Sequence, residues 1–138
     1  MSGQRPFRFG VSIREAGSGR AWADKARRAE ELGYSTFLVA DHFGAQLATT
    51  PALAAAAAAT ERIRIGSFVY SNDFRHPALV AKEAATLDVL SGGRFELGLG
   101  AGWMRSEYER AGIPFDRSGT RLERLEESVT IVRGLLEG

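Results

Sequence analysis

The chain has 138 residues, of which 44% are hydrophobic and 25% charged, with 18 basic against 17 acidic side chains and a formal net charge of +1. This length predicts a single domain over residues 1–138, and the nearly neutral charge provides no field that would attract nucleic acid or anionic lipid. The absence of cysteine excludes disulfides, thiolate metal sites and a cysteine nucleophile.

The sequence carries no sign of export or membrane insertion. The first ten residues, MSGQRPFRFG, lack the apolar core of a signal peptide. No uninterrupted apolar run approaches the roughly 20 residues that a membrane span needs. We therefore expect a cytoplasmic protein with no membrane partner.

Apolar strand candidates alternate with helical stretches along the chain. The segments FRFGVSI, STFLVA, IRIGSFVY and RFELGLG begin near residues 7, 35, 63 and 94. Helices are predicted between them over residues 20–32, 51–60 and 77–90, followed by a short helix near residues 103–112 and a long one from Thr120. Such alternation predicts right-handed crossovers and a parallel sheet, which makes the fold α/β of the type (βα)4.

Several residues suggest where the helices begin. Pro51 and Pro77 suit the first helical position, and His76 directly before Pro77 is interpreted as a structural N-cap. Thr120 and Glu123 have the spacing of a capping box at the start of the last helix.

Two parallel architectures remain open on this pattern. An open doubly wound sheet can consist of four units, whereas a closed (β/α)8 barrel needs eight units and about 250 residues. A dinucleotide fingerprint after the fourth strand is excluded, because its third glycine would fall at the position of Trp103.

Candidate site residues follow the strands. In both architectures ligands bind beyond the carboxyl ends of the strands, so the residues there should share one rim. Asp41 and His42 follow the second strand, SFVYSND closes the third, and the fourth is followed by Gly98, Gly100 and Gly102. Simpler interpretations exist: Asp41 could bond amides of its own loop, His42 could be a satisfied loop histidine, and the glycines could only permit a tight turn. Two histidines without an HExxH pattern predict no metal site.

These pieces together resemble a known family. The stretches ELGYSTFLVADHFG and RHPALVAKEAATLDVLSGGRFELGLGAGW, in this order and spacing, resemble the luciferase-like monooxygenase superfamily, and more closely its branch that uses the deazaflavin coenzyme F420. The resemblance runs from about residue 7 to the end. It implies a luciferase-like TIM (β/α)8 barrel with the cofactor across the carboxyl rim, of which this chain is the truncated N-terminal (βα)4 half.

The resemblance also implies roles for particular residues. Asp41 and His42 match an acid and a histidine near the deazaflavin ring, with His42 as the catalytic proton carrier. Phe68 and Val69 match a bulged third strand, where many members hold a non-proline cis peptide against the ring. Further cofactor contacts are implied for Ser71 at the polar edge of the ring and for Gly100 and Ala101 after the fourth strand.

The implied activity is F420-dependent hydride transfer with a small-molecule substrate; the alternatives are an FMN-dependent monooxygenase and a non-catalytic half-barrel. Sugar-phosphate oxidation is disfavoured, since Ala101 stands where those dehydrogenases have a catalytic glutamate, and GAQ where they have a tryptophan. A half-barrel would leave strand edges unpaired and an apolar inner face exposed, so we expect a homodimer or higher oligomer.

Overall fold

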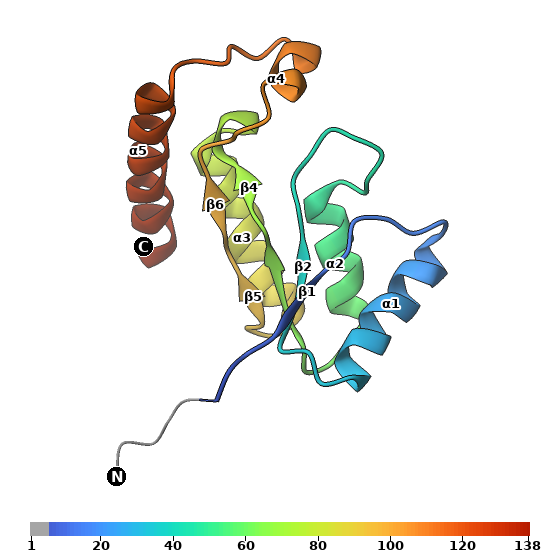
Figure 1. Cartoon of the computed structure of the whole chain (residues 1–138). Helices are drawn as coiled ribbons and strands as arrows, with labels where there is room; N and C mark the ends of the chain where they lie inside the picture. Colours follow the sequence, from blue (N-terminus) through green and yellow to red (C-terminus); the bar gives the residue numbers. More distant parts are fainter. Residues whose placement is uncertain (1–5) are drawn as a thin grey trace.

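The computed structural model describes residues 6–138, a series of short strands and helices (Figure 1). The strands are β1 (Gly10–Ser12), β2 (Thr36–Val39), β3 (Arg64–Ser67), β4 (Tyr70–Ser71), β5 (Phe95–Glu96) and β6 (Leu99–Gly100). The helices are α1 (Gly19–Glu31), α2 (Thr49–Ala59), the 3₁₀ turn η1 (Asn72–Phe74), α3 (Pro77–Ser91), α4 (Arg105–Ala111) and α5 (Ser118–Glu137). Over this described stretch, no helix is both long and apolar enough to cross a membrane.

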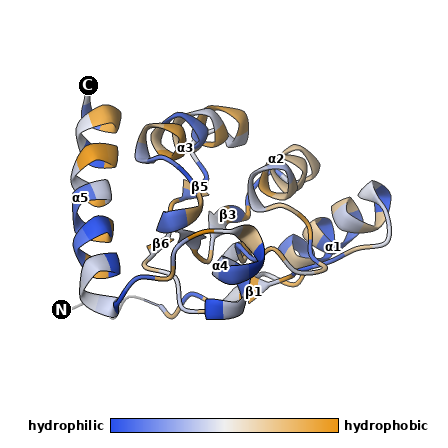
Figure 2. Cartoon of the chain, turned by 90° about the horizontal axis from the view of Figure 1, so that it is seen from above, coloured by the Kyte–Doolittle hydropathy of each residue, from blue (hydrophilic) through white to orange (hydrophobic). Residues whose placement is uncertain are grey.

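The strands are parallel and adjacent in sequence order. One sheet has the order β1-β2-β3-β5, and β4 pairs with β6 in a second, two-stranded sheet. An open doubly wound sheet reverses its strand order and carries helices on both faces. Here α1, α2, α3 and α5 form an arc around the strands when the chain is seen from above (Figure 2). The arrangement is a segment of a barrel wall.

The third and fourth predicted strands are each divided in two, which corrects the expectation of four continuous strands. β3 stops before Phe68, the Phe68–Val69 peptide bond is cis, and pairing resumes with β4. The fourth segment breaks in the same layer, where Gly98 lies so close to β3 that an added Cβ would be 2.5 Å from the carbonyl oxygen of Ser67. The close approach of the two backbones at Gly98 and Ser67 therefore lies where the four-stranded sheet ends and the β4–β6 pair begins.

The hydrophobic core lies between the outer face of the sheet and the helices. Phe37, Val39 and Ile65 are fully buried there. Trp22 of α1 packs edge-on against Phe37 with ring centroids 5.2 Å apart, and its indole nitrogen donates to the backbone carbonyl of Ala52 in α2 at 2.8 Å. The small side chains of α2 let it lie close to the sheet, as Ala52, Ala56 and Ala57 are buried.

The inner face of the sheet is polar at its lower end, which corrects the expected apolar surface. Glu96 of β5 accepts hydrogen bonds from Arg8 and from Arg64 of β3, each at 2.6 Å. Burial raises the pKa of Glu96, but the hydrogen bonds from the two arginines outweigh it and hold that pKa below its ordinary value. Thr36 of β2 joins the group by accepting from Arg8 at 3.1 Å. Because these side chains are charged or polar, this part of the inner face can remain in contact with water.

The helix ends confirm the predictions for His76 and Pro77 and correct those for Pro51 and Thr120. His76 is the N-cap of α3, where its Nδ1 accepts from the amide of Ala78 at 3.2 Å and Pro77 takes the first position. Pro51 is the third residue of α2 rather than the first, since that helix begins at Thr49.

The last helix also begins earlier than its capping-box spacing indicated. α5 starts at Ser118 after Arg117, with no side-chain cap bond, so Thr120 lies inside its first turn. Contacts with the preceding loop explain the early start: the Arg121 guanidinium stacks over Phe115 at 4.0 Å, and Arg124 bonds Asp116 at 2.7 Å.

The apolar stripe of α5 is largely exposed. Val132 is buried and packs with Val80 and Ala81 of α3. It is the only buried member of the five apolar residues that recur at intervals of three and four, namely Leu122, Leu125, Val129, Val132 and Leu136. The elements lying against α5 are chiefly α3, η1 and β6, which cover only one side of it. Exposed apolar side chains on this helix are Leu122, Val129, Ile131, Leu135 and Leu136.

Candidate functional site

A cavity of about 260 Å³ opens at the carboxyl ends of the strands, beside α4. It brings together the end of β2, the β3–β4 junction and the turn after β6. The seven residues to which the resemblance gives a role all line it, namely Asp41, His42, Phe68, Val69, Ser71, Gly100 and Ala101. Of the other glycines after the fourth strand, Gly102 lines the cavity and Gly98 does not. The structure therefore gathers on one rim the segments that the strand pattern assigned to it.

His42 is tied to a buried acid on α4. Its Nδ1 lies 2.9 Å from Oε2 of Glu107, whose side chain is only 4% exposed. The other oxygen of Glu107, Oε1, accepts from the backbone N–H of Phe43 at 2.9 Å. The indole of Trp103 meets the His42 ring edge-on with centroids 6.1 Å apart. The loop after β2 is thus anchored to α4 through one carboxylate.

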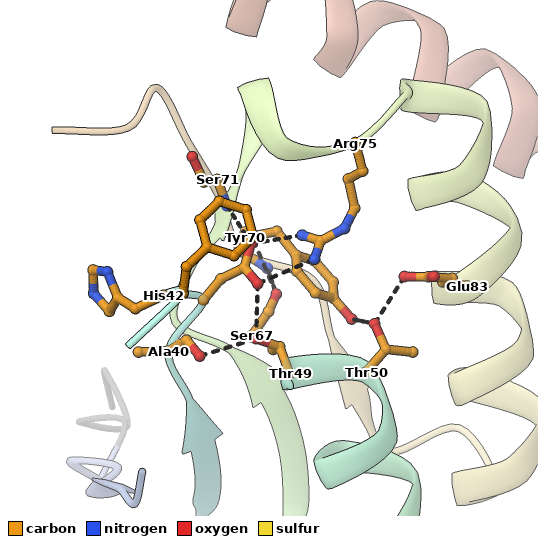
Figure 3. Close-up of polar contacts among 12 residues, drawn as sticks. Ala40, His42, Thr49, Thr50, Ser67, Tyr70, Ser71, Arg75 and Glu83 are labelled. Carbon is orange, nitrogen blue, oxygen red and sulfur yellow. Dashed lines mark hydrogen bonds and ion pairs between the residues drawn. The ribbon is translucent and has the colours of Figure 1, made fainter. Parts of the chain in front are cut away.

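Asp41 is held by four hydrogen bonds from the chain itself. Arg75 donates to both carboxylate oxygens, at 2.6 and 3.0 Å, while the Ser71 amide and the Thr49 hydroxyl each donate at 2.9 Å. A carboxylate has about four lone-pair sites, so these donors occupy its capacity. The carboxylate fastens the start of α2 to β4. In Figure 3 the His42 ring lies to the left and Arg75 to the right.

A second hydrogen-bonded network, formed by Tyr70, Thr50 and Glu83, lies next to the pair of Asp41 and Arg75. The Thr50 hydroxyl has a single proton, which it donates to Glu83 at 2.8 Å, so Tyr70 donates its phenolic proton to Thr50 at 2.7 Å (Figure 3). Burial raises the pKa of Tyr70 to about 12, which keeps that phenol protonated. The guanidinium of Arg75 stacks over the Tyr70 ring at 4.3 Å. The guanidinium of Arg75 is therefore engaged by Asp41 and by the Tyr70 ring.

Ser71 lines the cavity and lies beside Tyr108 of α4. Its hydroxyl oxygen is buried and makes no hydrogen bond of ordinary geometry with residues 6–138. Tyr108 of α4 lies nearby and donates to Asp73 at 3.0 Å. Burial raises the pKa of the Tyr108 phenol, and Asp73 raises it further, while the nearby Ser71 hydroxyl opposes the shift.

Glycine is required at two positions of the turn that closes the cavity. A Cβ on Gly100 would lie 2.6 Å from a methyl group of Val69. Gly102 has a φ of +76°, and a Cβ there would overlap the hydroxyl of Tyr108. The turn after β6 therefore passes close to both the β3–β4 junction and α4.

The remaining walls are apolar and partly open. Phe68 is 60% exposed and Trp103 70% exposed, and Val69 and Met104 complete this side of the cavity. The lining residues within the described chain include no lysine or arginine. In the same stretch, no group of three or more histidine and acidic side chains is placed to hold a metal ion. An uncharged planar ring with polar atoms along one edge suits such walls.

Sequence reasoning missed the residues that support the site. Glu107 and Tyr108 lie in the segment WMRSEYERAG, which the pattern identified only as a short helix. Their buried positions follow from contacts with residues 65 and 35 positions away in the chain. Arg75 likewise reaches Asp41 across 34 positions. No local signal distinguishes these three from the exposed charged residues around them.

The family model described as luciferase-like monooxygenase matches residues 5–138. This chain belongs to that family, and its parallel α/β fold forms part of the family's barrel. In structure it is similar to the coenzyme F420 dependent tetrahydromethanopterin reductase from Methanopyrus kandleri, with a TM-score of 0.71 and 30% identity over 78% of this chain and 30% of that one.

Two curated relatives illustrate the range of the family. A 4-hydroxyprotoasukamycin monooxygenase of Streptomyces nodosus subsp. asukaensis is 40% identical over 113 residues, which are 79% of this chain and 30% of that protein. An F420-dependent glucose-6-phosphate dehydrogenase of Intrasporangium calvum is 37% identical over 126 residues, which are 84% of this chain and 38% of that protein. The chain thus spans less than two-fifths of the length of either relative.

Proposed function

We propose that this chain supplies part of the active site of an F420-dependent oxidoreductase, which transfers a hydride between the deazaflavin coenzyme and a small organic substrate. The observation that carries the proposal is that His42, Ser71 and the Phe68–Val69 surface line the same cavity. The similarity to an F420-dependent dehydrogenase and to an F420-dependent reductase supports this choice of coenzyme.

The cavity fits a deazaflavin ring in its chemistry. The exposed side chains of Phe68 and Val69 offer an apolar surface for a planar heterocycle, and the polar residue Ser71 lines the same cavity. Gly100 and Ala101 add little side-chain bulk and leave room beside the β3–β4 junction. When bound there, coenzyme F420 would supply the two-electron hydride chemistry.

His42 is the residue we assign to proton exchange with the substrate. An imidazole can accept or release a proton near neutral pH, and this ring lines the cavity with its side chain 24% exposed. Asp41 would act through its neighbours, because its lone pairs are already used by Arg75, Thr49 and the Ser71 amide. It would hold Ser71 in place for the coenzyme.

The lining favours an uncharged substrate. A phosphorylated sugar needs cationic partners, the lining contains no lysine or arginine, and Arg75 behind it is paired with Asp41. Ala101 also provides no acid at the position where the sugar-phosphate dehydrogenases are expected to have a glutamate. Trp103 and Met104 instead offer apolar contacts at the mouth of the cavity. We therefore propose a small alcohol, carbonyl compound or unsaturated organic molecule as the substrate class.

An FMN-dependent monooxygenase is the second candidate, favoured by the 40% identity to a monooxygenase over 113 residues. Separate titrations of F420 and FMN with the full product of the reading frame that carries this sequence separate the two. The first proposal predicts saturable quenching of F420 fluorescence and weaker binding of FMN. Tight binding of FMN without any response from F420 would establish the second candidate instead. Binding of neither ligand would leave the chain as a non-catalytic barrel segment.

A further inference from the structure

The carboxylate of Glu107 makes two hydrogen bonds to the loop after β2, and one of them is to the His42 ring. Both oxygens of Glu107 are engaged, Oε2 with the His42 ring and Oε1 with the Phe43 amide, each at 2.9 Å. The side chain of Glu107 is 4% exposed, so water does not compete freely for either oxygen. One buried carboxylate therefore binds two neighbouring residues of the same loop.

We propose that Glu107 is a positioning residue that fixes the tautomer of His42. An ionised carboxylate can only accept, so the proton of the neutral imidazole must sit on Nδ1. The other nitrogen, Nε2, is then unprotonated, and among residues 6–138 it has no hydrogen-bond partner. It is the ring nitrogen that can accept a proton from a molecule in the cavity. The buried acid of a Ser-His-Asp triad holds its histidine in the same way.

This assignment gives the proton a defined route, and here it rests on the proposed function. When an alcohol is oxidised, its C–H bond breaks, and bound coenzyme F420 would take up both electrons of that bond as hydride. The hydroxyl proton passes to Nε2 of His42, and the carbonyl double bond forms. The imidazolium that results lies beside the Glu107 carboxylate, which stabilises the new positive charge. The alcohol loses two electrons and the coenzyme gains them.

The second oxygen of Glu107 makes the inference sharply testable. In the variant Glu107→Gln, the backbone N–H of Phe43 still requires an acceptor, so the amide oxygen of the glutamine should stay on it. The amide NH₂ then faces Nδ1 of His42 and donates to it. The ring proton must move to Nε2, which can no longer accept. The variant would keep both hydrogen bonds and nearly the same shape, yet it would reverse the tautomer.

The chain contains its own reference for this measurement. It has two histidines, and Nδ1 of His76 accepts from the Ala78 amide at 3.2 Å. The neutral His76 ring must therefore carry its proton on Nε2. The wild-type chain should show two neutral imidazoles in opposite tautomers, which a long-range ¹H–¹⁵N correlation spectrum distinguishes directly.

The experiment records this spectrum for the 138-residue chain at a pH at which both imidazoles are neutral. We expect the Nδ1–H form for His42 in the wild type and the Nε2–H form in Glu107→Gln, with His76 unchanged in both. An Nε2–H form of His42 in the wild type would overturn the inference, and this result needs no variant to fold. An unchanged tautomer in a folded Glu107→Gln variant would overturn it as well.

Turnover then tests the role of the tautomer separately from the proposed function. In the full reading-frame product, Glu107→Gln should lower turnover by about two to four decades and leave the coenzyme dissociation constant within about threefold. Adding Glu107→Gln to His42→Ala should cause no further loss. Full turnover by a variant with the reversed tautomer would refute the positioning role. The predicted tautomers in a protein that binds no F420 would refute the proposed function and leave the assignment of the His42 proton intact.

Discussion

The ion pair between Asp41 and Arg75 should dominate the stability of the upper half of the sheet. The two side chains are 9% and 17% exposed, and their closest nitrogen and oxygen are 2.6 Å apart. In Asp41→Asn the carboxylate loses its charge, and its amide group opposes a donor. Two unit charges about 4 Å apart attract by about 4 kcal/mol at an effective dielectric constant of 20. The variant leaves the Arg75 guanidinium without its counter-charge, between Tyr70 and a neutral amide. We therefore expect a loss of about 3–5 kcal/mol in the free energy of unfolding.

Urea denaturation followed by circular dichroism measures this loss. The matched control is Glu31→Gln, which removes an exposed ion pair with Arg28 and should change the free energy of unfolding by less than about 0.5 kcal/mol. The double variant Asp41→Asn/Arg75→Gln should be more stable than the sum of the single changes predicts, since neither charge is left alone. A loss below about 1 kcal/mol for Asp41→Asn would refute the reasoning.

Four further predictions concern the turn, the pH dependence, catalysis and assembly. Gly102→Ala should lower the free energy of unfolding by more than about 2 kcal/mol in urea titrations, whereas Gly112→Ala, with a similar φ of +68° and open space around it, should cost only about 1 kcal/mol. The depressed pKa of Glu96 stabilises the fold fully above the ordinary value of 4.5 and progressively less as the pH falls toward the folded-state pKa. Urea midpoints should therefore fall in that acidic range, and less steeply in Glu96→Gln. His42→Ala should lower turnover of the full product by about two to four decades in steady-state assays, and unchanged turnover would remove its catalytic role. Light scattering coupled to size exclusion should find the 138-residue chain self-associated through the exposed apolar side of α5, and a monodisperse species of 14.9 kDa would contradict that expectation.

The rim of the site could be predicted because it depends on strand order alone. Parallel strands place their carboxyl ends on one edge, so His42, Ser71 and Gly100 had to approach one another once the alternating pattern was recognised. The roles of Glu107 and Arg75 could not be predicted, because each is defined by a partner in a distant segment. Asp41 shows the same limit: its position was predictable, whereas the donors that occupy its oxygens were not.

The fold shows a similar division. The segments that became β1 and β2 and the helices α1 and α3 follow from local hydrophobic periodicity and, for α3, from the His76–Pro77 start. The breaks within the third and fourth strands arise where Gly98 approaches Ser67, a contact between segments 31 residues apart. The early start of α5 likewise depends on side chains that fasten it to the preceding loop. Periodicity carries no information about either contact.

Hydrogen-exchange mass spectrometry of the full reading-frame product, with and without saturating F420, tests most directly whether this cavity holds the coenzyme. We expect slower exchange of the backbone amides over residues 68–72 and 100–104, two segments that contribute lining residues to the cavity, and no change over residues 19–31 in α1, which contribute none. Protection confined to other segments, or binding of F420 without protection of these two, would contradict it.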